Sequence, residues 1–126
     1  MPKVIIGTDC GNSPKNIFLK DMVAAIIKGN RTFFLASITE DIRWDIIGNP
    51  LLQGKDEVAK ALERMKGDKE TTLTIKHIAT HGKAGAVDGT IQFGNGRTLE
   101  FCDVFEFSNS TGTSVKEITS YVIERK

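Results

Sequence analysis

The sequence lacks several features that would assign it to a particular class of protein. Its two cysteines, Cys10 and Cys102, are too few for a disulfide framework and do not have the spacing of metal ligands. Acidic and basic residues nearly balance, and a net charge of +1 gives no reason to expect a nucleic acid or a membrane as partner. The apolar stretch at residues 1–7 is too short for a signal peptide or a membrane span. These absences predict a soluble, cytoplasmic protein with free thiols.

What is present is the composition of one globular domain. Of the 126 residues, 40% are hydrophobic and 26% are charged, which is enough for a core without disulfides or metals. No internal repeat, low-complexity segment or linker divides the chain. The first firm helix signal is Ser13 followed by Pro14, a capping residue before a favoured first helical residue. We therefore predict an N-terminal arm over residues 1–12 and a single domain over residues 13–126.

The first half of the chain has mainly helical periodicity. Apolar residues recur at helical spacing over residues 14–29, where a glycine ends the pattern, and a shorter helix is expected at residues 30–38. A third helix, with an acidic first turn, is expected at residues 53–67. Between the second and third helices, residues 42–47 have the pattern of a short strand.

From residue 71 onward the apolar pattern changes to a period of two. Short turns separate the segments, so the strands must be antiparallel neighbours. Four strands are expected, at residues 71–80, 84–93, 97–107 and 115–125. Three helices with one strand among them, followed by a four-stranded meander, predict an α+β fold with the helices on one face of the sheet.

Two aspartates occupy unusual positions in this pattern. Asp45 lies in the short strand, on the face opposite Trp44, where it is either exposed to solvent or held in a pocket. Asp103 shares one strand face with Leu99, Phe101, Phe105 and Phe107. Burial among apolar residues disfavours the charged form of a carboxyl and raises its pKa, and a second carboxylate nearby raises it further. Such a pair can divide the roles of acid and base.

The order of elements resembles that of the NTF2-like superfamily, whose members include SnoaL-like and ketosteroid-isomerase-like proteins. The resemblance covers nearly the whole chain. It rests on Phe33-Phe34, residues 40–45, Gly48, residues 54–58, residues 103–107 and residues 118–121. The resemblance implies a strongly curved, mostly antiparallel sheet that wraps around three helices to form a cone, with a pocket at the wide end.

Comparison with the ketosteroid isomerases implies roles for individual residues. Asp45, in Asp45-Ile46-Ile47-Gly48, corresponds to their general base, and Asp103 corresponds to their protonated oxyanion donor. Met22 stands where their second donor, a tyrosine, is expected, and a thioether cannot donate a hydrogen bond. The resemblance therefore implies acid–base chemistry between Asp45 and Asp103 on a small hydrophobic molecule, as in a cofactor-free isomerase, cyclase or hydrolase, and argues against steroid isomerisation.

Further residues are candidates for the wall of this pocket. Phe101 and Phe105 flank Asp103 on its face, Met22 belongs to the first helix, and Tyr121 could supply a hydroxyl donor. His77 could act as an acid or base, although a packed or hydrogen-bonded histidine is the alternative. His77 and His81 are four residues apart on one strand, too far for easy chelation, so no metal site is expected.

Three functions remain open at this stage: an enzyme without a cofactor, a non-catalytic pocket for a hydrophobic metabolite, and a dimerising interaction domain. The last is suggested by apolar residues expected on the face of the sheet that the helices leave uncovered. These residues are Ile78, Cys102, Val104, Ile118 and Val122. They lead us to expect a homodimer formed through the outer face of the sheet.

Overall fold

The structure is a computed structural model that describes residues 2–111 and 113–126. Over this range the elements are β1 (Lys3–Asp9), α1 (Pro14–Lys28), α2 (Arg31–Ala36), β2 (Ile38–Ile46), β3 (Leu52–Gln53), α3 (Lys55–Met65), β4 (Thr72–His81), β5 (Ala84–Gln92), β6 (Thr98–Phe107) and β7 (Val115–Glu124). Within the part described, no helix has the length and apolarity needed to cross a membrane.

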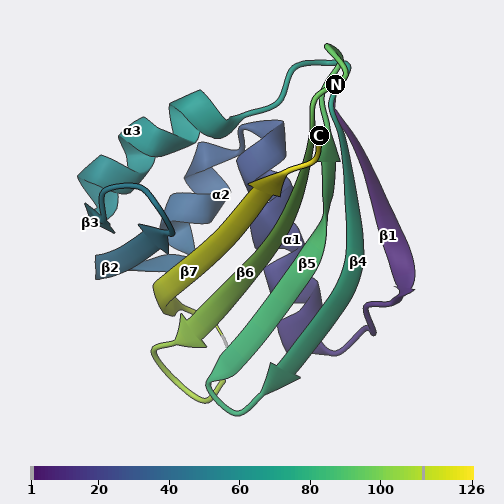
Figure 1. Cartoon of the computed structure of the whole chain (residues 1–126). Helices are drawn as coiled ribbons and strands as arrows, with labels where there is room; N and C mark the ends of the chain where they lie inside the picture. The colour runs from purple at the N-terminus through teal and green to yellow at the C-terminus, as the bar shows by residue number, and fades with distance from the viewer. Residues whose placement is uncertain (1, 112) are drawn as a thin grey trace.

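The seven strands of the described chain form one sheet in the order β1-β4-β5-β6-β7-β2-β3. Neighbours from β4 to β7 are antiparallel, whereas β1 runs parallel to β4 and β2 runs parallel to β7. Figure 1 shows the long strands curving around the helices, which lie on the concave side of the sheet. The α+β fold with a strongly curved, mostly antiparallel sheet is confirmed.

Residues 3–9, expected as part of an N-terminal arm, form an edge strand instead. Lys3 to Ile6 pair with Thr72 to Ile75 of β4, and the Lys3 amide donates to the Thr71 carbonyl at 2.9 Å. This pairing could not be predicted from the sequence, because β1 and β4 are parallel strands far apart in the chain. No local turn links them, so no short-range pattern marks the partner.

The residues expected from the sequence to begin and end the first helix do so in the structure. The Ser13 hydroxyl accepts the Asn16 amide at the start of α1, and Gly29 ends the helix with a left-handed φ of 74°. Asn30 caps α2 in the same way by accepting the Phe33 amide. These caps satisfy amide groups that have no partner within the helix, which fixes where each helix begins.

Two strands contain irregularities that change which side chains face the helices. The register of β4 shifts between Ile75 and His77, and that of β7 shifts next to Val115. As a result Ile78 and Ile118 are only 6% and 2% exposed and belong to the core. The expected outer apolar face therefore loses both residues.

Val122 also leaves the expected outer face, because it points to the concave side of β7. Of the five residues expected there, only Cys102 and Val104 remain on the convex side.

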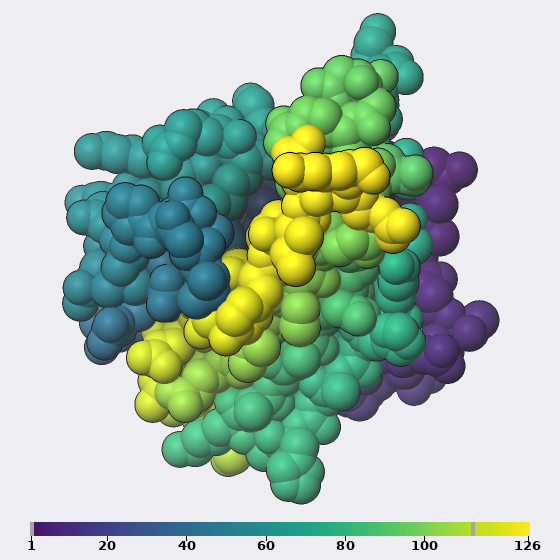
Figure 2. All heavy atoms as spheres, viewed as in Figure 1, coloured from purple at the N-terminus to yellow at the C-terminus, as the bar shows by residue number. Residues whose placement is uncertain are grey.

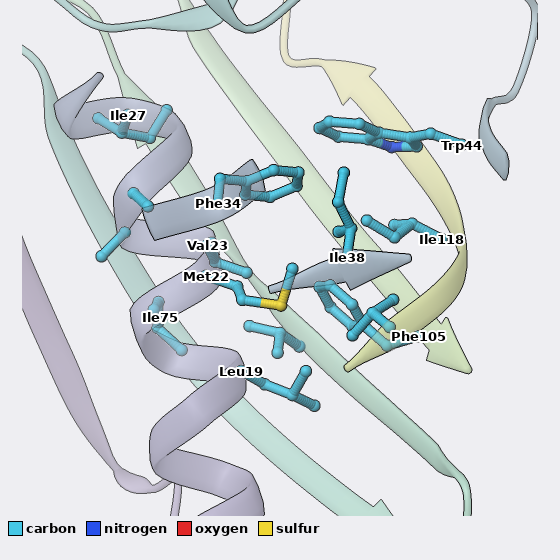
Figure 3. Close-up of a cluster of buried hydrophobic side chains, with 14 of the residues drawn as sticks. Leu19, Met22, Val23, Ile27, Phe34, Ile38, Trp44, Ile75, Phe105 and Ile118 are labelled. Atoms are coloured by element: carbon cyan, nitrogen blue, oxygen red, sulfur yellow. The ribbon is translucent and has the colours of Figure 1, made fainter. Parts of the chain in front are cut away.

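The core fills one end of the cone. Figure 3 shows Leu19 and Met22 of α1 pointing toward Phe105 and Ile118 of the sheet. Farther along, the rings of Phe34 and Trp44 stack with centroids 5.3 Å apart. Each of the six side chains is at most 2% exposed: Leu19, Met22, Phe34, Trp44, Phe105 and Ile118. These side chains are closely packed and fill this end of the cone.

Candidate functional site

A cavity of about 590 Å³ lies beyond the core, between the helices and the sheet. Its walls are mainly apolar and include Ile26 and Ile27 of α1, Ile91 of β5, and Leu99 and Phe101 of β6. Figure 2 shows the molecular surface hollowed between α3 and the C-terminal strand β7. The polar residues that line the cavity are Asn49, Arg64, Lys66, Arg97, Asp103, Ser120 and Glu124.

Asp103 is the buried carboxyl of this cavity. It lies on the concave face of β6 between Phe101 and Phe105, and it is 6% exposed. Removal from water raises the pKa of Asp103 from 3.8 to about 6, while a hydrogen bond from Ser120 acts in the opposite direction. Desolvation is the larger effect because an apolar wall cannot replace the water that a carboxylate loses.

Ser120 and Trp44 hold Asp103 from the neighbouring strands. Ser120 lies directly opposite Asp103 in the β6–β7 pair. The indole Nε1 of Trp44 donates to the Ser120 hydroxyl oxygen at 2.8 Å. Since an indole N–H can only donate, the serine accepts from Trp44 and directs its own proton to the Asp103 carboxyl. This chain fixes the carboxyl and leaves it capacity to take up a proton or a ligand group.

Asp45 does not share this cavity. It is exposed and lies opposite Thr119 on the convex side of the β2–β7 pair. Its neighbour Trp44 occupies the concave side, and alternation along a strand sends Asp45 the other way. The expectation that Asp45 and Asp103 face each other in one pocket is therefore corrected, and the solvent-exposed alternative describes Asp45.

The remaining candidates divide between wall, core and outer surface. Phe101 lines the cavity. Met22 and Phe105 are at most 1% exposed and belong to the core rather than to the lining. In the described structure α1 contributes only the apolar side chains of Val23, Ile26 and Ile27 to the cavity, so this helix offers no hydrogen-bond donor to a ligand there.

His77 and Tyr121 lie on the convex face, away from the cavity. The register shift in β4 turns His77 outward, where its Nδ1 lies 2.9 Å from Oδ1 of Asp88. Tyr121 is 49% exposed and lies opposite Cys102 on β6. Side chains alternate between the two faces of a strand, and in each strand the residue adjacent to His77 or Tyr121 faces inward. Neither His77 nor Tyr121 therefore reaches the cavity.

Several residues of the site were not expected from the sequence. Arg64 and Lys66 come from the end of α3, Arg97 precedes β6, and Glu124 ends β7. The Nη2 and Nε atoms of Arg97 lie 2.9 and 3.3 Å from the two carboxylate oxygens of Glu124. No local pattern marks this rim. Ser120 was not expected either, because Ile118, two residues before it on the same strand side, was itself expected on the outer face of the sheet.

Among the residues that the structure describes, no group of three or more His, Cys, Asp or Glu side chains is placed to hold a metal ion.

Comparisons with known proteins identify the architecture. The sequence profile described as the SnoaL-like domain matches residues 19–113. An NTF2-like protein of unknown function from Cytophaga hutchinsonii is 25% identical, with a TM-score of 0.65 over 85% of this chain and 97% of the other. A candidate ketosteroid isomerase from Kribbella flavida gives a TM-score of 0.73 at 18% identity, over 89% and 79%.

A third solved structure agrees with these two. A candidate SnoaL-like polyketide cyclase from Shewanella putrefaciens gives a TM-score of 0.74 at 13% identity, over 88% of this chain and 80% of the other. Likeness at such low identity establishes the fold alone. A search of curated proteins gave no significant match.

Proposed function

The chain belongs to the SnoaL-like domain family, and we propose that it binds a small hydrophobic carbonyl compound and moves a proton on it without a cofactor. Asp103 is the acid–base residue of this proposal. The reaction class is an isomerisation or a cyclisation that passes through an enolate. The names of two similar structures, a candidate ketosteroid isomerase and a candidate SnoaL-like polyketide cyclase, are compatible with this class.

The observation that carries the proposal is the environment of Asp103. A carboxyl with a pKa of about 6 is ionised at neutral pH and is a stronger base than an exposed aspartate. The apolar wall around it favours a hydrophobic ligand. The Ser120–Trp44 chain holds the carboxyl in one orientation, which general base catalysis requires.

The reaction needs one group that both takes and returns a proton. The Asp103 carboxylate removes a proton from the carbon beside the carbonyl, so that the C–H bond breaks and its electron pair forms the enolate. The protonated Asp103 then returns the proton. It goes either to another carbon of the same enolate or, when the enolate carbon attacks a second carbonyl of the same molecule and the C=O π bond of that carbonyl breaks, to the resulting alkoxide oxygen. Proton and electrons balance without any other reactant, and this mechanism replaces the two-aspartate pair expected from the sequence.

Hydrogen–deuterium exchange tests this step without knowledge of the natural substrate. The bicyclic ketone 2-tetralone is incubated with the protein in D₂O, and deuterium uptake at its α-carbons is followed by NMR. We expect the protein to accelerate exchange and Asp103→Asn to reduce that acceleration by about a hundredfold or more. The rate should fall as the pH drops below about 6, because protonated Asp103 cannot accept a proton.

Asp45→Asn is the matched control, since it removes the same charge from the convex face and should leave exchange unchanged. Exchange at the same rate in wild type and Asp103→Asn would contradict the proposal. Binding of 2-tetralone without accelerated exchange would instead favour a non-catalytic pocket. The absence of a donor on α1 also leads us to expect little or no isomerisation of a 3-oxo-Δ5 steroid.

A further inference from the structure

The mouth of the cavity carries an excess of positive charge. Three of its lining residues, Arg64, Lys66 and Arg97, are exposed cations. Among the described lining residues only Glu124 and the buried Asp103 are acidic. A cavity with an apolar interior and a cationic rim is suited to a ligand with an apolar body and an anionic end.

The rim cations differ in how far their charge is already neutralised. Glu124 contacts Arg97 through both carboxylate oxygens, so this pair is internally balanced. Lys66 lies 3.8 Å from Glu63, whose other oxygen accepts from Arg31 at 3.1 Å. In the described part of the chain, the guanidinium of Arg64 forms no hydrogen bond or ion pair.

The nearest acids along the chain do not supply the missing partner. Glu63 is engaged by Arg31 and Lys66. Asp68 accepts hydrogen bonds from the Glu70 amide at 2.9 Å and from the Thr71 hydroxyl at 3.0 Å. Among the cations that the structure describes at this mouth, Arg64 is thus the one whose charge no carboxylate of the protein balances.

We propose that the cavity takes hydrophobic ligands that carry a carboxylate, and that Arg64 binds this carboxylate at the mouth. A guanidinium presents paired N–H donors whose spacing matches two carboxylate oxygens. Met65, next to Arg64, and Ile26 line the same cavity as Asp103 and offer apolar surface to the body of such a ligand. The ligand therefore spans the cavity, with its acid at the rim and its body among the apolar residues.

Combined with the proposed function, this assigns the substrate class as a hydrophobic keto acid, and that assignment rests on the proposed role of Asp103. Recognition of the acid does not depend on catalysis and is measured by binding alone. The two proposals can therefore fail separately.

Three probes with one apolar body test the inference: 4-(2-naphthyl)butanoate, its primary amide, and 4-(2-naphthyl)butylammonium. Naphthyl fluorescence gives the Kd of each. We expect the carboxylate to bind about three- to tenfold more tightly than the amide at low salt, and the ammonium to bind most weakly. About 0.5 M NaCl should reduce the difference, because salt screens an exposed ion pair.

Arg64→Gln should bring the Kd values of the carboxylate and the amide to within twofold of each other, because it removes the positive charge and keeps a hydrogen-bond donor. Arg43→Gln is the matched control, since it removes an exposed arginine from the convex side of β2 and should preserve the difference. Arg64 is exposed, so its variant is expected to fold, which a thermal melt checks.

Equal affinity for the carboxylate and amide in the wild type would overturn the inference, as would a preference that survives Arg64→Gln. Neither result bears on deuterium exchange by Asp103. Conversely, a carboxylate preference that depends on Arg64, in a protein that fails to accelerate exchange, would support acid recognition and contradict only the proposed function.

Discussion

The two faces of β6 place neighbouring residues in opposite environments. On the concave face Phe101, Asp103 and Phe105 are at most 6% exposed, whereas Val104, between the last two, is 40% exposed. Glu100, on the convex face, accepts from Thr90, Arg125 and Lys76 near the surface, which lowers its pKa. The same type of group thus has its charge favoured on one face and disfavoured on the other, because only the concave face excludes water.

Asp45 and Asp103 show the same contrast between strands. Both lie within strands adjacent to β7, one opposite Thr119 and the other opposite Ser120. A difference of one residue in register places Asp45 in solvent and Asp103 against the cavity. The face of the sheet, rather than the residue type, decides which aspartate can act as a perturbed acid or base.

The largest difference in stability is expected between alanine substitutions at two neighbouring residues of β6 that lie on opposite faces of the sheet. Phe105→Ala should lower the free energy of unfolding by about 3–5 kcal/mol, because it removes a ring that is 1% exposed and leaves a void in the core. Val104→Ala should cost less than about 1 kcal/mol. Urea unfolding of both variants measures the difference, and similar losses would show that the convex face is packed as tightly as the core.

Replacing Asp103 should change how stability depends on pH. Its pKa is about 6 in the folded protein and 3.8 in the reference state, so the native protein binds the proton more tightly. Stability is highest while the group is protonated in both states and falls as the pH rises from about 4 to about 6. As the pH rises from about 4 to about 7, the free energy of unfolding of Asp103→Asn should therefore increase by about 3 kcal/mol relative to that of the wild type.

Chemical unfolding at several pH values measures this gain, with Asp45→Asn as the convex-face control. If the Asn variant instead lost stability relative to wild type as the pH rose, the native fold would favour the carboxylate. Asp103 would then be a structural residue rather than an acid–base group.

Ser120→Ala should shift the acid limb of the pH–rate profile for deuterium exchange toward higher pH by about one unit. Its hydroxyl lowers the pKa of Asp103, and a lost hydrogen bond of this kind corresponds to about one pKa unit. The pH dependence of 2-tetralone exchange measures the shift. Thr119→Ala, on the opposite face of β7, should leave the profile unchanged, and an unshifted profile for Ser120→Ala would show that Ser120 does not act on Asp103.

The smallest change in monomer stability is expected from a substitution that weakens association through the convex face of the sheet. We propose a homodimer in which this face, with Val104 and Tyr121 about half exposed, packs against a second copy. Val104→Lys should weaken the dimer with little change in monomer stability. Analytical ultracentrifugation at micromolar concentration tests this, and a wild-type protein that sediments only as a monomer would contradict it.

Features that depend on neighbouring residues could be predicted from the sequence. Ser13, Pro14 and Gly29 set the limits of α1 through contacts within one helical turn. The face shared by Phe101, Asp103 and Phe105 followed from uninterrupted alternation in β6, and the structure preserves it because β5 and β6 pair without a register shift.

Features that depend on register could not be predicted in the same way. The shift after Ile75 reverses the faces of β4, so His77 turns outward and Ile78 inward. The shift beside Val115 does the same in β7, which brings Ser120 rather than Tyr121 to the cavity. A single inserted residue moves every following side chain of a strand to the opposite face. No local sequence pattern predicted either insertion.

The sequence by itself determined the family fold, the ends of the first helix and the placement of Asp103 on an apolar face. Each follows from local spacing or from motifs in the chain. Only the tertiary structure decided that Asp45 lies in solvent, that Ser120 and Trp44 hold Asp103, and that Arg64 stands at the mouth. These positions depend on which strands pair and in what register, because contacts between distant segments form only when the whole sheet closes around the helices.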